Sequence, residues 1–309
     1  MMPKSPLPAE MGLIRDARLS QFTTFRLGGP CPALFPCRTP GQVHVAVAAC
    51  RRDGVPFRFM GGGSNLLVSD RGVDEVVIRF ESGPETLRFN GASIEADGGV
   101  PFDALASAAL EAGIAGFEFA TGIPGTLGGA IAGNAGAFGE QIGDRIEEVR
   151  VLAPDGSEHV IGPEAMSFSY RASGVADRKW IILSARMRGA PGDRGRLCAE
   201  RDRILAFRRD RHPDWRTVAT AGSFFRNIEP TSKASRRQAA GAFLESAGAG
   251  ALRVGAARTF PGHSNIIITS GPDPRASDVW RLSRWMATAV SARHGLQLKP
   301  EVQCWGVFE

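Results

Sequence analysis

The sequence has few lysines and no long hydrophobic segment. Only four of its 37 basic residues are lysines, and no glycine directly precedes any of them; they are Lys4, Lys179, Lys233 and Lys299. A P-loop with its Gly-Lys pair is therefore excluded. No apolar run approaches the roughly 18 residues needed to span a bilayer, and the polar stretch 1–19 has no apolar core, so it is not a signal peptide. We expect a cytoplasmic protein, and 309 residues suffice for about two domains.

The residue patterns typical of metal sites are also missing. The five cysteines contain no Cys-x-x-Cys, and the five histidines form neither His-Glu-x-x-His nor an i, i+4 pair. No metal is expected, and the odd cysteine count in apolar surroundings predicts reduced thiols. The net charge is +5, and between residues 186 and 216 arginines crowd together with acids interleaved among them. Without an aromatic ladder this pattern favours a solvated helix face over a nucleic-acid surface, so neither nucleic acid nor membrane is an expected partner.

Glycine is abundant, with 38 residues, and it is dense in two runs, 61–67 and 122–137. Neither run has the Gly-x-Gly-x-x-Gly spacing between a strand and a long helix that marks a Rossmann domain. Because glycine lacks Cβ and tolerates positive φ, consecutive backbone N–H groups can converge on an anion. Tight turns around crowded packing are the alternative, but two such runs favour the pyrophosphate of a dinucleotide.

Local signals predict an alternation of helices and strands. Thr39-Pro40-Gly41-Gln42 forms a capping box that starts a helix, and Asn90-Gly91 marks a hairpin. Ser277 is the predicted cap of the last helix and Gly295 its stop. The expected helices are 40–53, 102–111, 197–211 and 277–294, and the expected strands are 55–60, 76–80, 85–97 in two runs, 147–153, 180–188 and 265–269.

Several motifs, in this order along the chain, resemble the UDP-N-acetylenolpyruvoylglucosamine reductase family. They are Thr24-Phe25-Arg26-Leu27-Gly28-Gly29, the two glycine runs, Ser169-Tyr170-Arg171-Ala172-Ser173, Ala221-Gly222-Ser223-Phe224-Phe225-Arg226-Asn227, His263-Ser264-Asn265 and Leu298-Lys299-Pro300-Glu301-Val302. The resemblance implies an α+β fold of the vanillyl-alcohol-oxidase type. A FAD-binding domain at 20–189, with α/β subdomains at about 20–82 and 83–189, would precede a C-terminal α/β substrate-binding domain at 197–306.

The resemblance also implies a reaction and its cofactors. NADPH would reduce FAD, and the reduced enzyme would convert UDP-N-acetylglucosamine enolpyruvate into UDP-N-acetylmuramate for peptidoglycan synthesis. Arg171, a permanent and bidentate cation, suits the substrate carboxylate and the developing enolate. By family analogy Ser223 donates the proton to the α-carbon. Glu301 stabilises the intermediate, and a raised pKa is expected for it when substrate is bound.

The resemblance assigns the remaining site residues by motif position. The FAD-binding candidates are Gly61, Gly62, Gly63, Ser64, Asn65, Leu66, Gly122, Ile123, Pro124, Gly125, Thr126, Gly128, Gly129, Asn134, Ala135 and Gly136. The candidates for binding the nucleotide sugar are Tyr170, Asn227, His263 and Asn265, of which Asn227 and the His-Ser-Asn segment could instead cap turns. Tyr170 is the only tyrosine, so we expect the type II arrangement without a tyrosine-bearing lid, and a monomer.

The chain departs from the family pattern at two places. Ile228 stands where the family usually has proline, and residues 248–251 replace a Gly-Leu-Lys-Gly stretch, so a cation expected near the diphosphate is missing. Arg253 or Arg258 could take its place. These departures leave two alternatives to the cell-wall reductase: a paralogous flavin-dependent oxidoreductase, reductase or oxidase, acting on another acid in specialised metabolism, and a flavin-binding module without turnover.

Overall fold

The computed structural model describes residues 12–230 and 237–309. The chain forms two compact units that are not contiguous in sequence. Of the described residues, the first unit comprises 12–16, 32–62 and 75–207, and the second comprises 17–31, 63–74, 208–230 and 237–309. The predicted domain limits, which assumed continuous segments, remain predictions. The first eleven residues of the stretch 1–19 lie outside the described residues.

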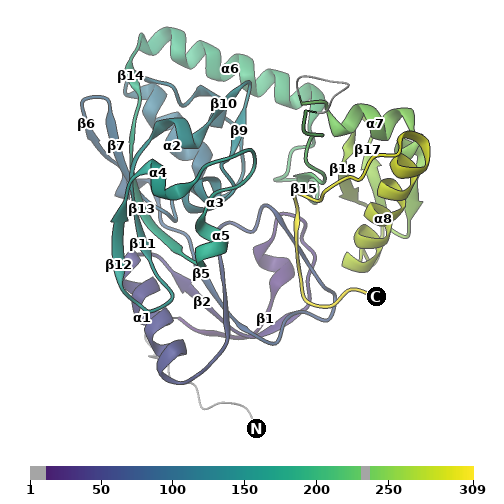
Figure 1. Cartoon of the computed structure of the whole chain (residues 1–309), viewed down its shortest axis with the longest axis horizontal. Helices are drawn as coiled ribbons and strands as arrows, with labels where there is room; N and C mark the ends of the chain where they lie inside the picture. Colours follow the sequence, from purple (N-terminus) through teal and green to yellow (C-terminus); the bar gives the residue numbers. More distant parts are fainter. Residues whose placement is uncertain (1–11, 231–236) are drawn as a thin grey trace. The chain divides into compact units, whose positions relative to one another are not determined.

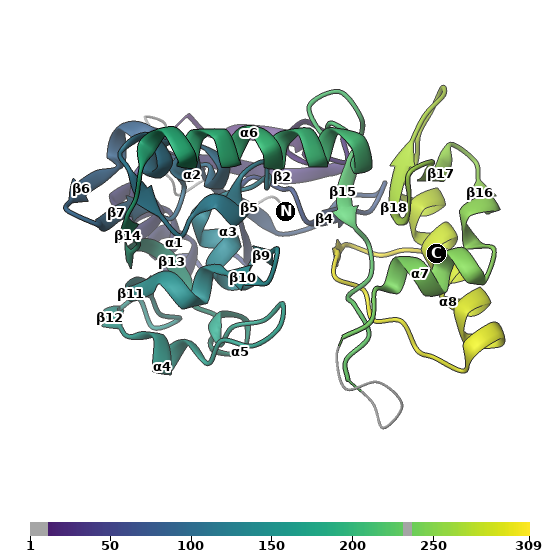
Figure 2. The same ribbon diagram turned by 90° about the horizontal axis from the view of Figure 1, so that it is seen from above.

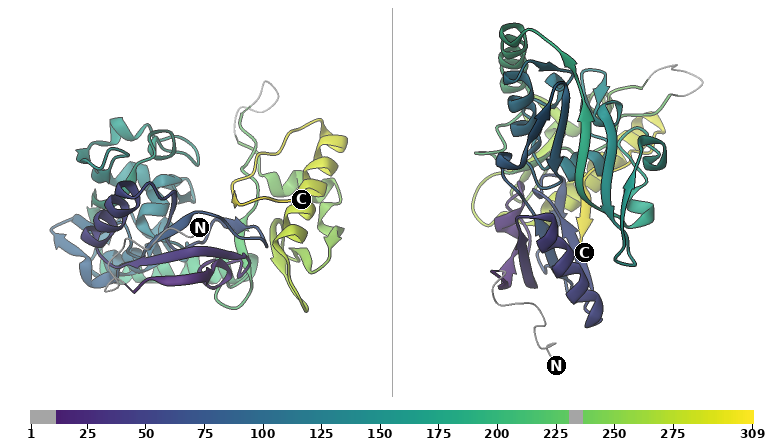
Figure 3. Two further views of the ribbon diagram at one scale, coloured as in Figure 1. Left: turned by 90° about the horizontal axis from the view of Figure 1, so that it is seen from below. Right: turned by 90° about the vertical axis from the view of Figure 1, so that its left-hand side faces the viewer.

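The first sheet has the strand order β1-β2-β5-β3. Its elements are β1 (Ile14–Arg18), β2 (Pro30–Cys37), α1 (Pro40–Arg52), β3 (Phe57–Met60) and β5 (Val76–Phe80). The predicted cap by Thr39 is confirmed, because its Oγ1 accepts the N–H of Gln42 at 3.2 Å, but the Gln42 side chain accepts the N–H of Arg38 at 2.6 Å rather than that of Thr39. β5 pairs in parallel with β2 and β3, and α1 packs its buried face on this sheet (Figure 3).

The second sheet has the order β12-β11-β13-β7-β6 and carries the larger core of the first unit. Its strands are β6 (Arg88–Asn90), β7 (Ser93–Asp97), β11 (Ile146–Leu152), β12 (Glu158–Ile161) and β13 (Ile181–Arg188). The predicted Asn90-Gly91 hairpin is confirmed, with Gly91 at φ +56°. Glu85 and Thr86, predicted as strand, belong instead to a 3-10 turn that begins at Pro84, because proline at the first position favours a turn and cannot donate to a strand ladder.

Short elements and helices surround this second sheet (Figure 1). α2 (Phe102–Glu111) has the predicted limits, and Gly113 follows it at φ +74°. α6 (Arg194–Arg211) begins three residues before its predicted start, and only its last four residues belong to the second unit. The others are β8 (Ile114–Ala115), α3 (Leu127–Ala132), β9 (Gly136–Ala137), β10 (Glu140–Gln141), α4 (Pro163–Met166), α5 (Val175–Arg178) and β14 (Ala190–Pro191).

The second unit is built on an antiparallel sheet of order β15-β18-β17-β16, seen in Figure 2. Its strands are β15 (Thr220–Ser223), β16 (Arg253–Val254), β17 (Ala257–Phe260) and β18 (His263–Thr269), and its helices are α7 (Ala240–Ser246) and α8 (Ala276–His294). β4 (Leu66–Val68) and β19 (Gln303–Trp305) form a separate parallel pair. The apolar face predicted for α8 is buried at Val279, Leu282, Met286 and Val290, whereas Ala289 is half-buried.

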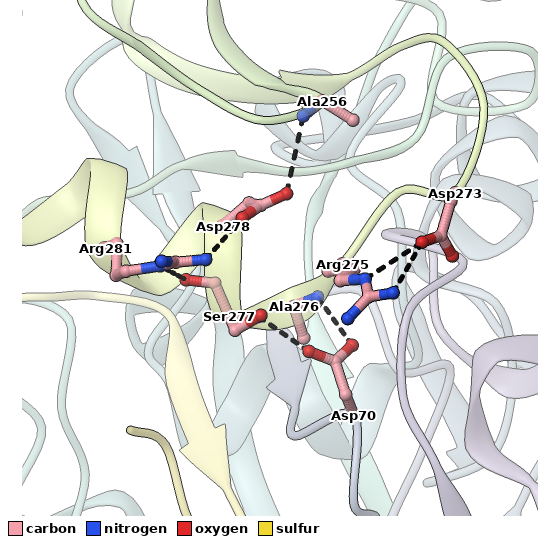
Figure 4. A network of polar contacts seen from close by, with 8 residues as sticks. All are labelled: Asp70, Ala256, Asp273, Arg275, Ala276, Ser277, Asp278 and Arg281. Carbon is pink, nitrogen blue, oxygen red and sulfur yellow. Dashed lines mark hydrogen bonds and ion pairs between the residues drawn. The ribbon is translucent and has the colours of Figure 1, made fainter.

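The predicted cap of α8 is wrong. Arg275 occupies the N-cap position without a side-chain cap, and Ser277 lies inside the helix. Asp70 caps the helix instead, since its carboxylate accepts the N–H groups of Ala276 at 2.8 Å and Ser277 at 3.0 Å (Figure 4). A carboxylate is favoured there by the positive end of the helix dipole. No described helix is long and apolar enough to cross a membrane.

Candidate active site

The two glycine runs meet in the first unit. A Cβ on Gly61 would lie 2.2 Å from Thr126 Oγ1, and one on Gly62 would lie 3.1 Å from Gly125 Cα. Within the described residues, the backbone N–H groups of Gly61, Gly62, Gly125 and Thr126 have no hydrogen-bond acceptor. Close backbone approach and free N–H groups are what an anion such as pyrophosphate requires, so this surface fits the diphosphate of FAD.

The start of the second run is held in place by Asp103. Its Oδ1 accepts the N–H of Gly122, at φ +73°, over 2.7 Å and the Arg201 guanidinium over 2.8 Å. Thr126 then caps α3 by accepting the N–H of Gly129 at 3.3 Å. Gly128 packs against Gly98, to whose carbonyl it donates at 2.7 Å. The predicted FAD-binding segment from Gly122 to Gly129, which includes Ile123 and Pro124, is thus held by the capped helix α3 and by the half-buried ion pair between Asp103 and Arg201.

The first run crosses the limit between the units, and its second part has other contacts. Gly63 accepts the N–H of Thr24 at 3.2 Å. Asn65 donates its side-chain N–H to the Glu301 carbonyl at 3.0 Å and accepts the N–H of Gln303 at 3.0 Å. Leu66 is buried in β4. Within the second unit, Asn65 therefore fixes the backbone at Glu301.

Asn134 connects the second glycine run to the turn that carries Arg171. It is 1% exposed and adopts φ +43°. Its Nδ2 donates to Ser169 O at 2.8 Å and to Gln141 Oε1 at 2.9 Å, while its Oδ1 accepts the N–H of Gly143 at 3.0 Å. These contacts hold the base of the turn, and the prediction that Asn134 binds FAD stays a prediction. Ala135 and Gly136 follow it, with Gly136 in β9.

Arg171 lies at the tip of a tight turn. Ser169 and Ala172 form a bridge with hydrogen bonds of 3.0 and 3.2 Å, and Arg171 has φ +55°. Non-glycine residues in this region are strained, which is common at functional sites. The guanidinium lies 5.5 Å from the centre of the half-buried Tyr170 ring, and Ser173 Oγ anchors the other end by donating to Ala132 O at 2.8 Å.

Ser223 and Glu301 lie on neighbouring segments of the second unit. Gly222, at φ +73°, precedes Ser223 at the end of β15. The backbone N–H of Glu301 donates to the carbonyl of Phe224 at 2.8 Å, and the N–H of Arg226 donates to Lys299 O at 2.9 Å. Ser223 is therefore adjacent to the residue whose carbonyl bonds Glu301, so these two predicted catalytic residues lie on paired segments of the second unit. The third, Arg171, belongs to the first unit.

The predicted substrate residues of the second unit make structural contacts. Asn265, 2% exposed, accepts the N–H of Phe225 at 2.9 Å and donates to its carbonyl at 2.8 Å. Asn227 Oδ1 accepts the N–H of Ala240 at the start of α7 at 3.2 Å. These bonds fit the alternative that both residues cap turns, and their substrate roles stay predictions.

His263 lies at the start of β18 beside His212, a residue that the motifs did not indicate. The two ring centroids are 5.5 Å apart. Burial lowers the pKa of His263. Burial, with Arg208, His263 and Arg211 nearby, lowers the pKa of His212 to about 4, so both rings are neutral at pH 7.

The departure at Ile228 has a structural consequence. Its N–H donates to Gln238 O at 2.9 Å, and its carbonyl accepts the Gln238 N–H at 3.0 Å. Proline could not make the first bond. At the other departure, Gly248 has φ +72° and Gly250 O accepts the Thr259 hydroxyl at 2.9 Å.

Comparison with known proteins shows the family. Residues 32–162 match the model of the FAD binding domain, and residues 213–305 match that of the UDP-N-acetylenolpyruvoylglucosamine reductase C-terminal domain. The chain belongs to the UDP-N-acetylenolpyruvoylglucosamine reductase family. The reductase of Synechococcus sp. (strain RCC307) is 35% identical over 306 residues, covering 98% of this chain and 97% of the relative. That of Paramagnetospirillum magneticum is 36% identical, covering 94% and 91%.

A solved member of this reductase family has the same fold. The crystal structure of the Thermus caldophilus UDP-N-acetylenolpyruvylglucosamine reductase has a TM-score of 0.77 and 30% identity, and covers 94% of this chain and 98% of its own. The predicted fold class, a FAD-binding domain followed by a C-terminal α/β domain, is confirmed. The residue roles rest on the motif positions and on the contacts described above.

Proposed function

We propose that this chain reduces UDP-N-acetylglucosamine enolpyruvate to UDP-N-acetylmuramate, with FAD as cofactor and NADPH as reductant. The observation that carries the proposal is similarity to reductases of this name along almost the whole chain, 35% identity over 98% of it. The free N–H groups of Gly61, Gly62, Gly125 and Thr126 support FAD binding. A bound FAD would supply hydride transfer from NADPH to the enolpyruvyl group.

Each proposed catalytic residue of the chain has a chemical task. Arg171 binds the carboxylate of the enolpyruvyl group and stabilises the charge that develops when hydride reaches the β-carbon. Ser223 donates a proton to the α-carbon, which requires a preorganised surrounding because a serine hydroxyl is a weak acid. Glu301 hydrogen-bonds the developing enediolate. Asn134 and Asn265 act as positioning residues, because their buried amides hold the segments that carry Arg171 and Ser223.

Turnover of the purified holoenzyme tests this function. With NADPH and UDP-N-acetylglucosamine enolpyruvate, mass spectrometry should detect a product two mass units heavier, the lactyl ether, in a one-to-one ratio with oxidised NADPH. Absence of that product from a folded, FAD-loaded protein would overturn the proposal. Because the protein handles a nucleotide sugar and NADPH, we place it in the cytoplasm, and we propose that it acts as a monomer.

One observation favours the paralogue as a second candidate. The N–H of Ile228 donates to Gln238 O, a hydrogen bond that the family's usual proline cannot make. The backbone bonding after Asn227 therefore differs from the family pattern in the segment where the nucleotide sugar is expected. If NADPH reduces the flavin but the enolpyruvyl sugar does not reoxidise it, the second candidate gains support and the first loses it.

A further inference from the structure

The second unit contains a cavity of about 560 Å³ that no proposed catalytic residue lines. Its lining includes residues of β17, of β18 and of the chain segment 217–219 that leads into β15. Arg26, Arg258, Phe25, Phe260 and Ile268 are among its lining residues. All of them belong to one compact unit, and the volume is that of an ordinary small-molecule site.

The charge in this cavity is uncompensated. None of the described residues that line it is acidic, and neither Arg26 nor Arg258 makes an ion pair with any described residue. Asp273, which precedes the lining residue Pro274, is paired with Arg275 at 2.7 Å and so does not neutralise the cavity. Two guanidinium groups without a carboxylate form a favourable site for an anion.

Both arginines are held in position by neutral acceptors. Arg26 donates to the carbonyls of Arg216 and Thr217, the second at 3.1 Å, from a backbone at φ +53°. Arg258 donates its Nε–H to Ser270 Oγ at 3.1 Å. Since that bond uses only Nε, the terminal amino groups of Arg258 can reach a ligand. A strained non-glycine residue at a ligand site is a recurrent arrangement.

Much of the remaining lining is apolar, and Thr217, Thr269 and Ser270 add neutral polar groups. Phe25, Phe260 and Ile268, together with Pro261 and Pro274, offer flat and aliphatic surfaces beside the two cations. Such a combination suits a molecule with an anionic end and an apolar or aromatic body. We propose that this cavity is a binding site, separate from the catalytic centre, for a small organic anion that carries one phosphate or carboxylate group.

Calorimetric titration of the FAD-loaded enzyme with phenyl phosphate tests the proposal. We expect saturable binding of one molecule per chain, weaker or undetectable binding of phenol, and retention of binding in Ser223→Ala. Benzoate and inorganic phosphate, titrated in parallel, distinguish carboxylate from phosphate ligands and show what the aromatic body contributes. Saturable binding of phenyl phosphate or benzoate supports the site, and failure of both to saturate would overturn it.

Three variants locate the bound molecule. Arg258→Gln and Arg26→Asn, the second chosen because asparagine tolerates positive φ, should each weaken binding by about 10-fold or more, the effect of losing a charged hydrogen-bond donor. Arg284→Gln, which removes an exposed arginine of α8 that does not line the cavity, should leave it unchanged. Equal binding by wild type and Arg258→Gln would contradict the assignment.

Competition separates this site from the nucleotide-sugar site. Saturating UDP-N-acetylglucosamine should not displace phenyl phosphate. If it does, the anion occupies the substrate diphosphate site and the proposal of a separate site fails. This outcome is independent of the turnover experiment, because a chain without reductase activity can still bind the anion, and an active reductase can lack the second site.

Discussion

Replacing Asn134 with glycine tests whether this residue positions the Arg171 turn. Glycine tolerates the φ of +43°, so the substitution removes three side-chain hydrogen bonds without adding backbone strain. At about 1 kcal/mol for each net bond the loss is about 3 kcal/mol. The added freedom of glycine in the unfolded chain costs up to about 1 kcal/mol, and relief of the left-handed conformation returns a similar amount.

Urea denaturation followed by circular dichroism measures this loss. For a slope of about 3 kcal/mol per molar urea, the midpoint should fall by about 1 M. Asn90→Gly, at an exposed hairpin position, is the matched control and should lose about 1 kcal/mol or less. If the two variants lose equal stability, the Asn134 bonds do not hold the turn.

The functional consequence of Asn134→Gly follows from the same bonds. Without the donor to Ser169 O, Arg171 loses its fixed geometry, so reoxidation of the reduced flavin by substrate should slow while flavin reduction by NADPH stays near normal. The FAD dissociation constant provides the control for this interpretation. If FAD binding weakens and both half-reactions change together, Asn134 contacts the cofactor directly, as the sequence motif suggested.

Three further predictions concern stability and the cofactor. Asp70→Ala removes two charge-assisted hydrogen bonds from the start of α8 and, in thermal denaturation, should lower the free energy of unfolding by about 2 kcal/mol. The control Asp273→Asn changes an exposed ion pair and should lower it by less than about 0.5 kcal/mol. Equal losses would refute the capping role of Asp70. The pKa of His212 is about 4 in the folded state and 6.5 in the unfolded state, so the unfolded state binds more protons between these pH values. The free energy of unfolding should therefore fall as the pH drops from 6.5 to 4. His212→Gln should reduce this pH dependence, whereas the control His159→Gln, at an exposed hairpin position, should leave it unchanged. Acid precipitation should release FAD into the supernatant, since neither glycine run contains a histidine or cysteine for attachment; colour retained in the pellet, or release of FMN, would refute this.

Local signals in the sequence predicted local structure well. The Thr39 cap, the Asn90-Gly91 hairpin and the limits of α2 depend on residues a few positions apart, so the local sequence contains the information needed. The cap of α8 could not be found in this way, because Asp70 precedes Ala276 by 206 residues. Ser277 satisfies the local rule for a helix cap equally well, and only the folded chain shows that Asp70 is the cap.

The candidate site shows the same limit. Glycine content indicated close backbone approach, and the structure brings Gly62 against Gly125. Sequence motifs alone could not show that Asn65 holds Glu301 or that Asn134 holds Ser169, because both bonds join segments far apart in the chain. His212 was missed since it belongs to no motif, and its packing against His263 depends on the folded sheet.

Measuring the two half-reactions of Ser223→Ala by stopped flow tests the central claim most directly. NADPH reduces bound flavin without a protein acid at the substrate carbon, so that rate should stay near normal in the variant. Reoxidation by UDP-N-acetylglucosamine enolpyruvate needs the proton from Ser223 and should slow by roughly 10²–10⁴-fold, with partial retention in Ser223→Cys because a thiol can donate. Equal slowing of both half-reactions would contradict the account, since Ser223 would then shape the flavin pocket and the proton would come from Glu301 or water.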